Sequence, residues 1–471
     1  MLPSIATGNV ASALAGEYEV ANSLRFDDGS SDNLTKTFST DGTSHDIGTV
    51  SVWLKRSELG AEQGIFTAGS SNRNFIRFES NDTLTFRSVA DSFHLQTTQV
   101  FRDSNAWYHI VIAFDTTQST SSDRVKFYVN GTQVTDFGTE TYPALNLDIK
   151  LGAAELNAIG KDSEQTNPYY DGYMAEFVYI DGTQLDATSF GEFDEDSGIW
   201  KPKNVSSLTF GTNGFHLDFE DSSALGNDVS GNNNDFTANN LTSIDQTTDT
   251  CTNNFATLNP LSTVHTENIS SMLSEGNTKY DPTGDYSIVK STIPFPESGK
   301  WYVEIKLGTS GTINGQFGVM RIPATSNATN SYIGYATNDA GYAYYNGKVK
   351  RSTGGSGDTR TDLATGLASY SSGDTLAMLF NADDNEIKWY VQDSLQYTLD
   401  LSSAPHGYYA NDGEWVFALS AYGTYNAYNL NFGSPSVSIS SGNTDGNGYG
   451  NFEFATKGGY ALCTKNLAEF G

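Results

Sequence analysis

Short runs in which side chains alternate between two faces constrain this chain more than any other feature. The run "WYHIVIAFD" (residues 107–115) has apolar residues on both faces of an extended segment. The run "VKFYVNG" (residues 125–131) has them on one face and closes on Asn-Gly, a pair typical of tight turns. Similar runs return as "GKWYVEIKLG" and "NEIKWYVQDS" far downstream. A period of two indicates strands, so the chain favours sheets built in two regions.

Composition agrees with many short strands. The chain has 26 Tyr, 27 Phe and 46 Gly in 471 residues, and that length exceeds what one hydrophobic core usually holds. We therefore predict an all-β protein of two antiparallel β-sandwich (jelly-roll) domains joined by a polar linker. The predicted boundaries are an N-terminal arm at 1–22, a first sandwich at 23–221, an Asn/Gly/Ser/Thr-rich linker at 222–283, a second sandwich at 284–434 and a C-terminal tail at 435–471.

Charge and cysteine content narrow the possible partners. The 56 acidic and 26 basic residues give a net charge of -30, which repels phosphate backbones, so no nucleic-acid partner is expected. The start lacks the pattern of a signal peptide and no apolar run is long enough to span a membrane, so membrane insertion is not expected. Cys251 and Cys463 are interpreted as two structural thiols, although a disulfide between them stays open.

The first region resembles a known family on specific runs. "SVWLKR", "WYHIVIAFD" and "DRVKFYVNG" have the order and spacing of central strands in the laminin-G-like, concanavalin-A-like jelly roll. Together with "AEFVYIDGTQLDATSFGEFDEDSGIWKPK" they are similar to an arrangement found in structural proteins of tailed bacteriophages. In the second region "KWYVEI", "GQFGVM", "YYNGKVK" and the closing "LNFG" resemble a SPRY domain, with departures in the loops that carry recognition in that family.

The resemblance implies a non-enzymatic phage virion protein. The expected role is a fibre or spike subunit that attaches to a host-surface glycan. The alternative is a head or tail decoration or connector protein without receptor binding. The expected partners are other virion proteins, bound through the arm at residues 1–22, and a host glycan. A homo-oligomer is expected, with a trimer favoured, located on the virion surface.

Three acidic residues form the strongest catalytic candidate. In "EFDED", Glu192, Asp194 and Asp196 would share one face of a strand, as in jelly-roll glycosidases that retain configuration. A glycan depolymerase is therefore a second alternative, but the motif sits where the chain turns out of its domain. We expect no catalytic residue and interpret His109, flanked by Tyr108 and Ile110, as a hydrogen-bonded core residue.

Binding candidates remain at two kinds of motif. Calcium is the one cofactor considered, at "EDSSALGNDVSGNNND", with oxygen ligands from Asp221, Asn227, Asp228, Asn232 and Asp235. A weaker candidate for a calcium site is "NTDGNGYG", around Asp445. Turn formation explains both motifs without a metal ion. For glycan, aromatic platforms are expected from a subset of tyrosines in "GYAYYNG" and "SAYGTYNAYN", namely Tyr342, Tyr344, Tyr345, Tyr422 and Tyr425.

Overall fold

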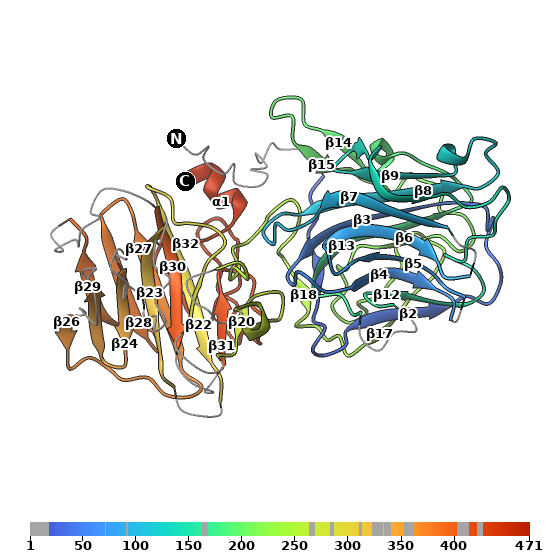
Figure 1. Cartoon of the computed structure of the whole chain (residues 1–471). Coiled ribbons are helices and arrows are strands. Elements are labelled where there is room, and N and C mark those ends of the chain that lie inside the picture. Colours follow the sequence, from blue (N-terminus) through green and yellow to red (C-terminus); the bar gives the residue numbers. More distant parts are fainter. Residues whose placement is uncertain are drawn as a thin grey trace. The chain divides into compact units, whose positions relative to one another are not determined.

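The computed structural model describes residues 18–70, 72–90, 93–162, 168–262, 269–282, 287–309, 313–322, 333, 341–352, 361–402, 414–421 and 427–471. The chain divides into two compact units, here called the N-terminal unit (residues 13–253) and the C-terminal unit (residues 254–471). Both are built from antiparallel sheets, as Figure 1 shows, which confirms the predicted fold class. Among the described residues, no helix is both long and apolar enough to cross a membrane.

The N-terminal unit consists of two eight-stranded sheets and a small hairpin. The first sheet has the order β10-β9-β8-β3-β13-β1-β18, and β16 pairs with β13. Its strands are β1 (Ser23–Phe26), β3 (Ile47–Arg56), β8 (Tyr108–Asp115), β9 (Val125–Val129), β10 (Thr132–Gln133), β13 (Gly172–Asp181), β16 (Phe215–Leu217) and β18 (Gln246–Thr247). The hairpin joins β14 (Gly191–Phe193) to β15 (Trp200–Pro202).

The second sheet of this unit has the order β11-β7-β6-β5-β4-β12-β2-β17. Its strands, several of which run side by side in Figure 1, are β2 (Asn33–Thr37), β4 (Gln63–Ala68), β5 (Asn74–Phe78), β6 (Thr83–Ser88), β7 (His94–Val100), β11 (Phe137–Thr141), β12 (Leu156–Ile159) and β17 (Thr237–Asn239).

The alternating runs behave as their period predicts. Ile110, Ile112 and Phe114 of β8 lie in the main core, whereas Val111 on the opposite face lies in a second buried cluster. Both faces of β8 are therefore covered. On β9 the apolar residues are buried and the intervening ones are half-buried. The turn that follows places Asn130 at a φ of 46°, in the left-handed region that Asn tolerates well.

The C-terminal unit also consists of two sheets around one core. One has the order β19-β20-β31-β22-β27-β28-β29, with β32 paired to β22, and the other has the order β21-β30-β23-β24-β25-β26. The strands of the first are β19 (Leu273–Ser274), β20 (Lys279–Tyr280), β22 (Lys300–Leu307), β27 (Thr375–Asn381), β28 (Glu386–Val391), β29 (Ser394–Asp400), β31 (Tyr428–Asn431) and β32 (Tyr460–Ala461). Those of the second are β21 (Ser287–Lys290), β23 (Gly315–Ile322), β24 (Gly341–Tyr345), β25 (Lys348–Ser352), β26 (Thr361–Thr365) and β30 (Glu414–Ala421).

The segment expected to be a linker, residues 222–283, is instead part of both units. Strands β17 and β18 pair with β2 and β1, and β20 pairs with β31. Buried cations explain part of this difference. Lys55 Nζ lies 2.5 Å from Asp249 Oδ2, and Arg25 lies 3.1 Å from Asp245 Oδ1. A buried charge needs a partner, so β1 and β3 hold the end of the N-terminal unit in place.

The C-terminal segment is ordered against its own unit. β32 pairs in parallel with β22, and the short helix α1 (Thr464–Phe470) follows it. Both cysteines are buried thiols, Cys251 in the N-terminal unit and Cys463 in the C-terminal unit, as the sequence interpretation favoured. Of the predicted N-terminal arm, residues 1–17 lie outside the described residues.

Candidate functional site

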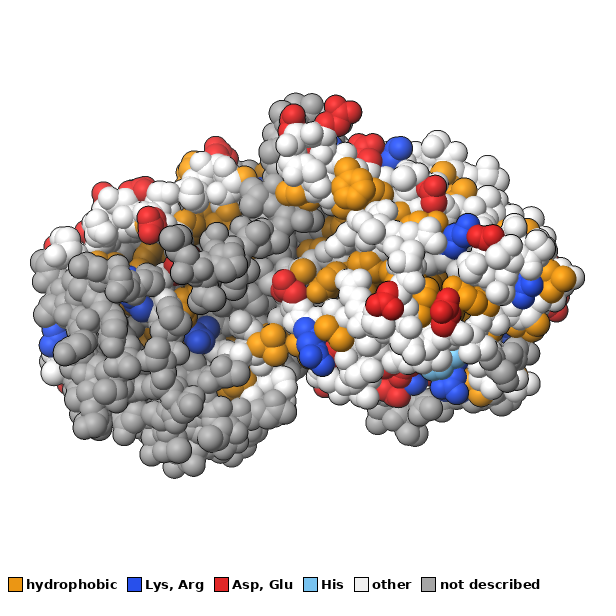
Figure 2. Space-filling view, turned by 45° about the horizontal axis from the view of Figure 1, so that its top comes forward, with side chains coloured by type: hydrophobic (Ala, Val, Ile, Leu, Met, Phe, Trp, Pro, Cys, Tyr) orange, Lys and Arg blue, Asp and Glu red, His pale blue; other side chains and the backbone are white. Residues whose placement is uncertain are grey.

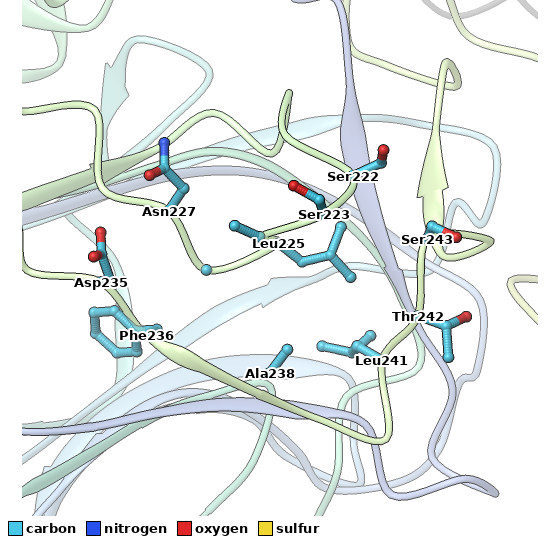
Figure 3. A pocket seen from close by; sticks show the side chains of 12 residues that line it. Ser222, Ser223, Leu225, Asn227, Asp235, Phe236, Ala238, Leu241, Thr242 and Ser243 are labelled. Atoms are coloured by element: carbon cyan, nitrogen blue, oxygen red, sulfur yellow. The ribbon is translucent and has the colours of Figure 1, made fainter.

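A polar-rimmed pocket of about 460 Å³ opens in the N-terminal unit, where residues 222–227 lie opposite residues 235–243. Figure 3 shows its two ends and its middle. Asn227 and Asp235 lie at one end, Thr242 and Ser243 lie at the other, and apolar side chains stand between them. A concave site with apolar walls and a few polar groups is the usual form of a small-molecule pocket.

The apolar part of the pocket is the outer edge of the unit's main core. Leu225 and Phe236 are buried members of that core, and Leu241 packs against it half-buried. Phe236 is held by an edge contact with Phe215 of β16, at 4.7 Å between ring centroids. The apolar wall of the pocket is therefore fixed by packing.

The polar part of the pocket is shaped by hydrogen bonds within its own loops. The N–H of Phe236 donates to the carbonyl of Gly226 at 2.8 Å, joining the two walls. A Cβ at Gly226 would lie 2.0 Å from the oxygen of Phe236, so only glycine permits this approach. The N–H of Asp228 donates to Asp235 Oδ1 at 2.9 Å, which orients that carboxylate at the pocket's rim.

The five predicted calcium ligands differ in their surroundings. Asn227 and Asp235 line the pocket. Asp221 is exposed and accepts from the N–H of Ser223 at 2.9 Å and from its hydroxyl at 2.6 Å, and these bonds lower the pKa of its carboxyl group. Asn232 donates its amide to the carbonyl of Gly214. These hydrogen bonds use part of the acceptor capacity of Asp221 and Asp235, while Asn232 acts as a donor, and the calcium site stays a prediction for these side chains.

Asp228, the buried member of the set, is the one that its hydrogen bonds remove as a calcium ligand. Its Oδ1 accepts the N–H groups of His216 and Ser230 at 2.9 Å each. Its Oδ2 accepts the N–H of Asn234 at 2.7 Å and the hydroxyl of Ser230 at 2.9 Å. A carboxylate offers about four lone-pair sites, and all four are occupied by donors. Asp228 therefore shapes the pocket and does not line it.

Sequence reasoning missed another carboxylate cluster. Asp27, Asp28 and Asp171 bring one oxygen each within 4.8 Å of one another, and no other such group of three occurs among the described residues. Burial and the neighbouring Asp27 raise the pKa of Asp28. The residues are far apart in sequence, at the end of β1 and the start of β13, and "FDDG" was the only local signal. Oxygen ligands of this type could hold a divalent cation.

The predicted glycan-binding tyrosines of β24 lie on opposite faces of that strand. Tyr342 and Tyr344 of β24 are buried in the core of the C-terminal unit, so the prediction that they present aromatic platforms is wrong. Because they are two residues apart on one strand, they share the inward face. Tyr345 faces the other way, is half-buried, and donates its hydroxyl to Asn314 Oδ1 at 2.7 Å. Tyr422 and Tyr425 lie outside the described residues.

The acidic hairpin does not form the predicted row of carboxylates. Glu192 lies on β14, but Asp194 and Asp196 lie in the turn beyond that strand. Asp194 accepts from the N–H and the hydroxyl of Ser197 at 2.7 Å and from Lys201 at 3.1 Å, and these contacts hold its pKa well below the ordinary value. A general acid needs a raised pKa, so Asp194 is unsuited to the acid role of a retaining glycosidase.

His109 is a core residue. Trp200 Nε1 donates to its Nδ1 at 2.9 Å, so its Nε2 carries the proton that faces Ser51 Oγ at 2.8 Å. Trp53 stacks on the ring at 4.7 Å. Complete burial lowers the pKa of His109 to about 3, and the imidazole is therefore neutral.

One stretch of the chain matches the model of a known protein family. Residues 28–187, about a third of the sequence, match the model of the concanavalin A-like lectin/glucanases superfamily. No curated protein sequence matches the chain.

Several solved structures are similar at low identity. Domains LG4-5 of the mouse laminin alpha1 chain have 10% identity and a TM-score of 0.29, covering 90% of this chain and 85% of that chain. The SPRY domain of human HERC1 has 12% identity and a TM-score of 0.24, covering 32% and 87%. A pentraxin of Limulus polyphemus has 14% identity and a TM-score of 0.26, covering 36% and 80%. The family match and the two-sheet architecture together show that the N-terminal unit has the laminin-G/concanavalin-A-like jelly-roll fold.

Proposed function

We propose that this chain is a non-enzymatic structural protein of a tailed-phage virion, a fibre or spike subunit that attaches to the host surface by binding glycan. The observation that carries the proposal is the pocket at residues 222–243, which combines an apolar wall with a polar rim in a unit of lectin-like fold. The virion assignment is supported by the resemblance of the sequence to phage structural proteins. The virion surface is the location that follows.

The pocket suits a sugar ring for chemical reasons. A pyranose has C–H groups that pack on apolar side chains and hydroxyl groups that need both donors and acceptors. Leu241 and Ala238 offer the apolar contact, and Asn227 and Asp235 offer an amide and a carboxylate at one end. Hydrogen bonds to a charged carboxylate are stronger than neutral ones, which favours Asp235 as the orienting group.

The first experiment measures binding of the labelled full chain to host cells and to their extracted surface polysaccharide. Saturable binding is expected, and Asn227→Ala should weaken it about tenfold by removing one amide contact to the glycan. Gln99→Ala removes an exposed amide from β7 and is the matched control. Equal binding by the two variants would exclude the pocket as the glycan site.

The same measurement separates the alternatives. Absence of cell binding by a folded, oligomeric protein would favour a decoration or connector protein, for which the arm at residues 1–22 is the proposed contact with other virion proteins. Deleting that arm should abolish assembly in either case, and under the attachment proposal it should leave cell binding unaffected. Release of oligosaccharides from the polysaccharide would contradict the non-enzymatic proposal outright. The proposed homo-oligomer, with a trimer favoured, is tested by light scattering of the full chain.

A further inference from the structure

The C-terminal unit contains a cavity of its own, of about 220 Å³. One wall is a sheet face, where Glu304 and Lys306 of β22 stand beside Asn431 of β31 and Thr375 of β27. This face is opposite the main core, which receives Val303 and Ile305 from the same strand. The other wall comes from residues 437–440 and 453. At about 30 Å³ per water, the cavity has room for one small polar molecule.

The cavity contains an excess of negative charge. Glu304 and Glu453 contribute two carboxylates, and Lys306 contributes one ammonium group. Lys306 Nζ donates to the carbonyl of Gly373 at 2.6 Å, which holds it at one end. The Glu453 carboxylate is positioned by the N–H of Ser440 at 2.9 Å and by the hydroxyl of the same residue.

Glu304 is buried and retains capacity for another donor. Its Oε1 accepts the Tyr302 hydroxyl at 3.0 Å and the N–H of Phe454 at 2.9 Å, and its Oε2 accepts the N–H of Glu453 at 2.8 Å. Only 1% of Glu304 is exposed. Among the described residues these three donors leave one of the four lone-pair sites, on Oε2, for a ligand.

We propose that this cavity binds a small hydroxylated primary amine, of which an amino sugar is the simplest example. The ligand's ammonium group lies between Glu304 and Glu453, where a cation compensates two carboxylates that face one cavity. Its hydroxyl groups contact Asn431 and Thr375, and its C–H groups contact Val437 and Ile439. This proposal concerns a different unit and does not rest on the glycan pocket of the N-terminal unit.

The ionisation of Glu304 is coupled to the charge of the ligand. Burial raises the pKa of Glu304, and the neighbouring charge of Glu453 raises it further. An incoming ammonium group favours the ionised form and therefore lowers that pKa.

The test is calorimetric titration of the full chain with D-glucosamine and, separately, with D-glucose. Saturable binding of glucosamine is expected, with glucose at least tenfold weaker because it lacks the ammonium group. Equal binding of the two sugars, or no saturable heat with glucosamine, would overturn the proposal.

Variants locate the site. Glu453→Gln keeps an acceptor for Ser440 and removes the charge, so it should weaken glucosamine binding about tenfold. Glu386→Gln is the matched control, because Glu386 lies on β28 and pairs with Lys388 outside the cavity.

Ser438→Trp places a large side chain at an exposed position of the lining and should block binding without disturbing the core. Unchanged binding in both Glu453→Gln and Ser438→Trp would contradict the assignment. Asn227→Ala in the N-terminal unit should have no effect, which separates this test from that of the proposed function.

Discussion

Asp228 in the N-terminal unit and Asp445 in the C-terminal unit lie in similar Asn- and Gly-rich loops, yet they organise their surroundings differently. Each is buried, and each carboxylate accepts four hydrogen bonds, two on each oxygen. The donors to Asp228 come mostly from its own loop, and the result is an open pocket beside it. Two donors to Asp445 come from β32 and from Asn466 of α1.

The source of the hydrogen-bond donors decides whether a loop with a buried carboxylate borders a pocket or joins other elements. A local set of donors shapes a loop and leaves nearby side chains such as Asp235 available to line a pocket. Donors that come from distant elements, as at Asp445, join those elements at the carboxylate; this meeting point is called the junction below. In both cases backbone and side-chain donors take the lone pairs that calcium would need. Asn- and Asp-rich composition therefore indicates turns before it indicates metal.

The largest effect is expected from Asp445→Ala. It leaves four donors without their acceptor, including the N–H of Ala461 at 2.9 Å and the Asn466 amide at 2.7 Å. The C-terminal unit should lose about 3–5 kcal/mol of stability, seen by scanning calorimetry as a lower melting temperature of one transition. Asp384→Ala is the control, since that carboxylate is exposed and its loss should leave the melting temperature almost unchanged. Similar losses in the two variants would refute the junction role.

A smaller loss is expected from Asp228→Ala, about 2–4 kcal/mol in the N-terminal unit, because part of its donor set lies near solvent. Glycan binding should disappear with it, since the pocket wall loses its shape. Asp221→Ala is the matched control: its carboxylate is exposed and accepts from the neighbouring Ser223, so the stability of the unit should change little. Retained glycan binding in Asp228→Ala would mean that the binding site does not depend on the shape of this loop.

The strands were predictable because packing leaves a period of two in the sequence. What that period cannot say is which face of a strand is the core. Tyr342, Tyr344 and Tyr345 of β24 illustrate this, since all three are amphipathic and only the facing sheet decides that the first two are buried. The pocket at residues 222–243 depends on two loop segments meeting, and no local pattern encodes that meeting.

The composition of residues 222–283 did not show that this segment belongs to the folded units. Two cations in the neighbouring strands did. Arg25 and Lys55 lie within apolar runs, and a cation there requires a buried anion. Asp245 and Asp249, in the polar segment, are those anions. The pairing could have placed residues 245–249 in the first domain, although which acid meets which cation depends on tertiary structure.

A buried carboxylate with fewer donors should behave differently from Asp228 and Asp445. Asp32 accepts the N–H of Asp27 at 3.0 Å, and burial raises its pKa from 3.8 to about 6. Its folded-state pKa exceeds the unfolded value, so its favourable contribution is complete below pH 3.8 and is lost as pH rises through 6. Asp32→Asn should remove this dependence and stabilise the unit at pH 7 by about 1–3 kcal/mol.

The check is urea denaturation of both proteins between pH 4 and pH 7, a range of about 3 pH units that spans the titration of Asp32. The midpoint difference between wild type and Asp32→Asn should grow with pH and level off above the folded-state pKa. A difference that is constant across this range would mean that Asp32 does not titrate there.

The smallest effect is expected from chelation. If donors already saturate Asp228 and Asp445, removing divalent cations should shift the melting temperature of either unit by no more than about 1 °C. A larger shift in the N-terminal unit would point to the cluster of Asp27, Asp28 and Asp171 instead. Asp171→Asn distinguishes the two sources: it should abolish a shift that arises at the cluster, whereas a shift that survives it would have to come from the loop at residues 221–235. That second result would mean that calcium competes successfully with the loop's own N–H groups, and the contrast between the two Asn-rich loops would then rest on metal rather than on hydrogen bonding.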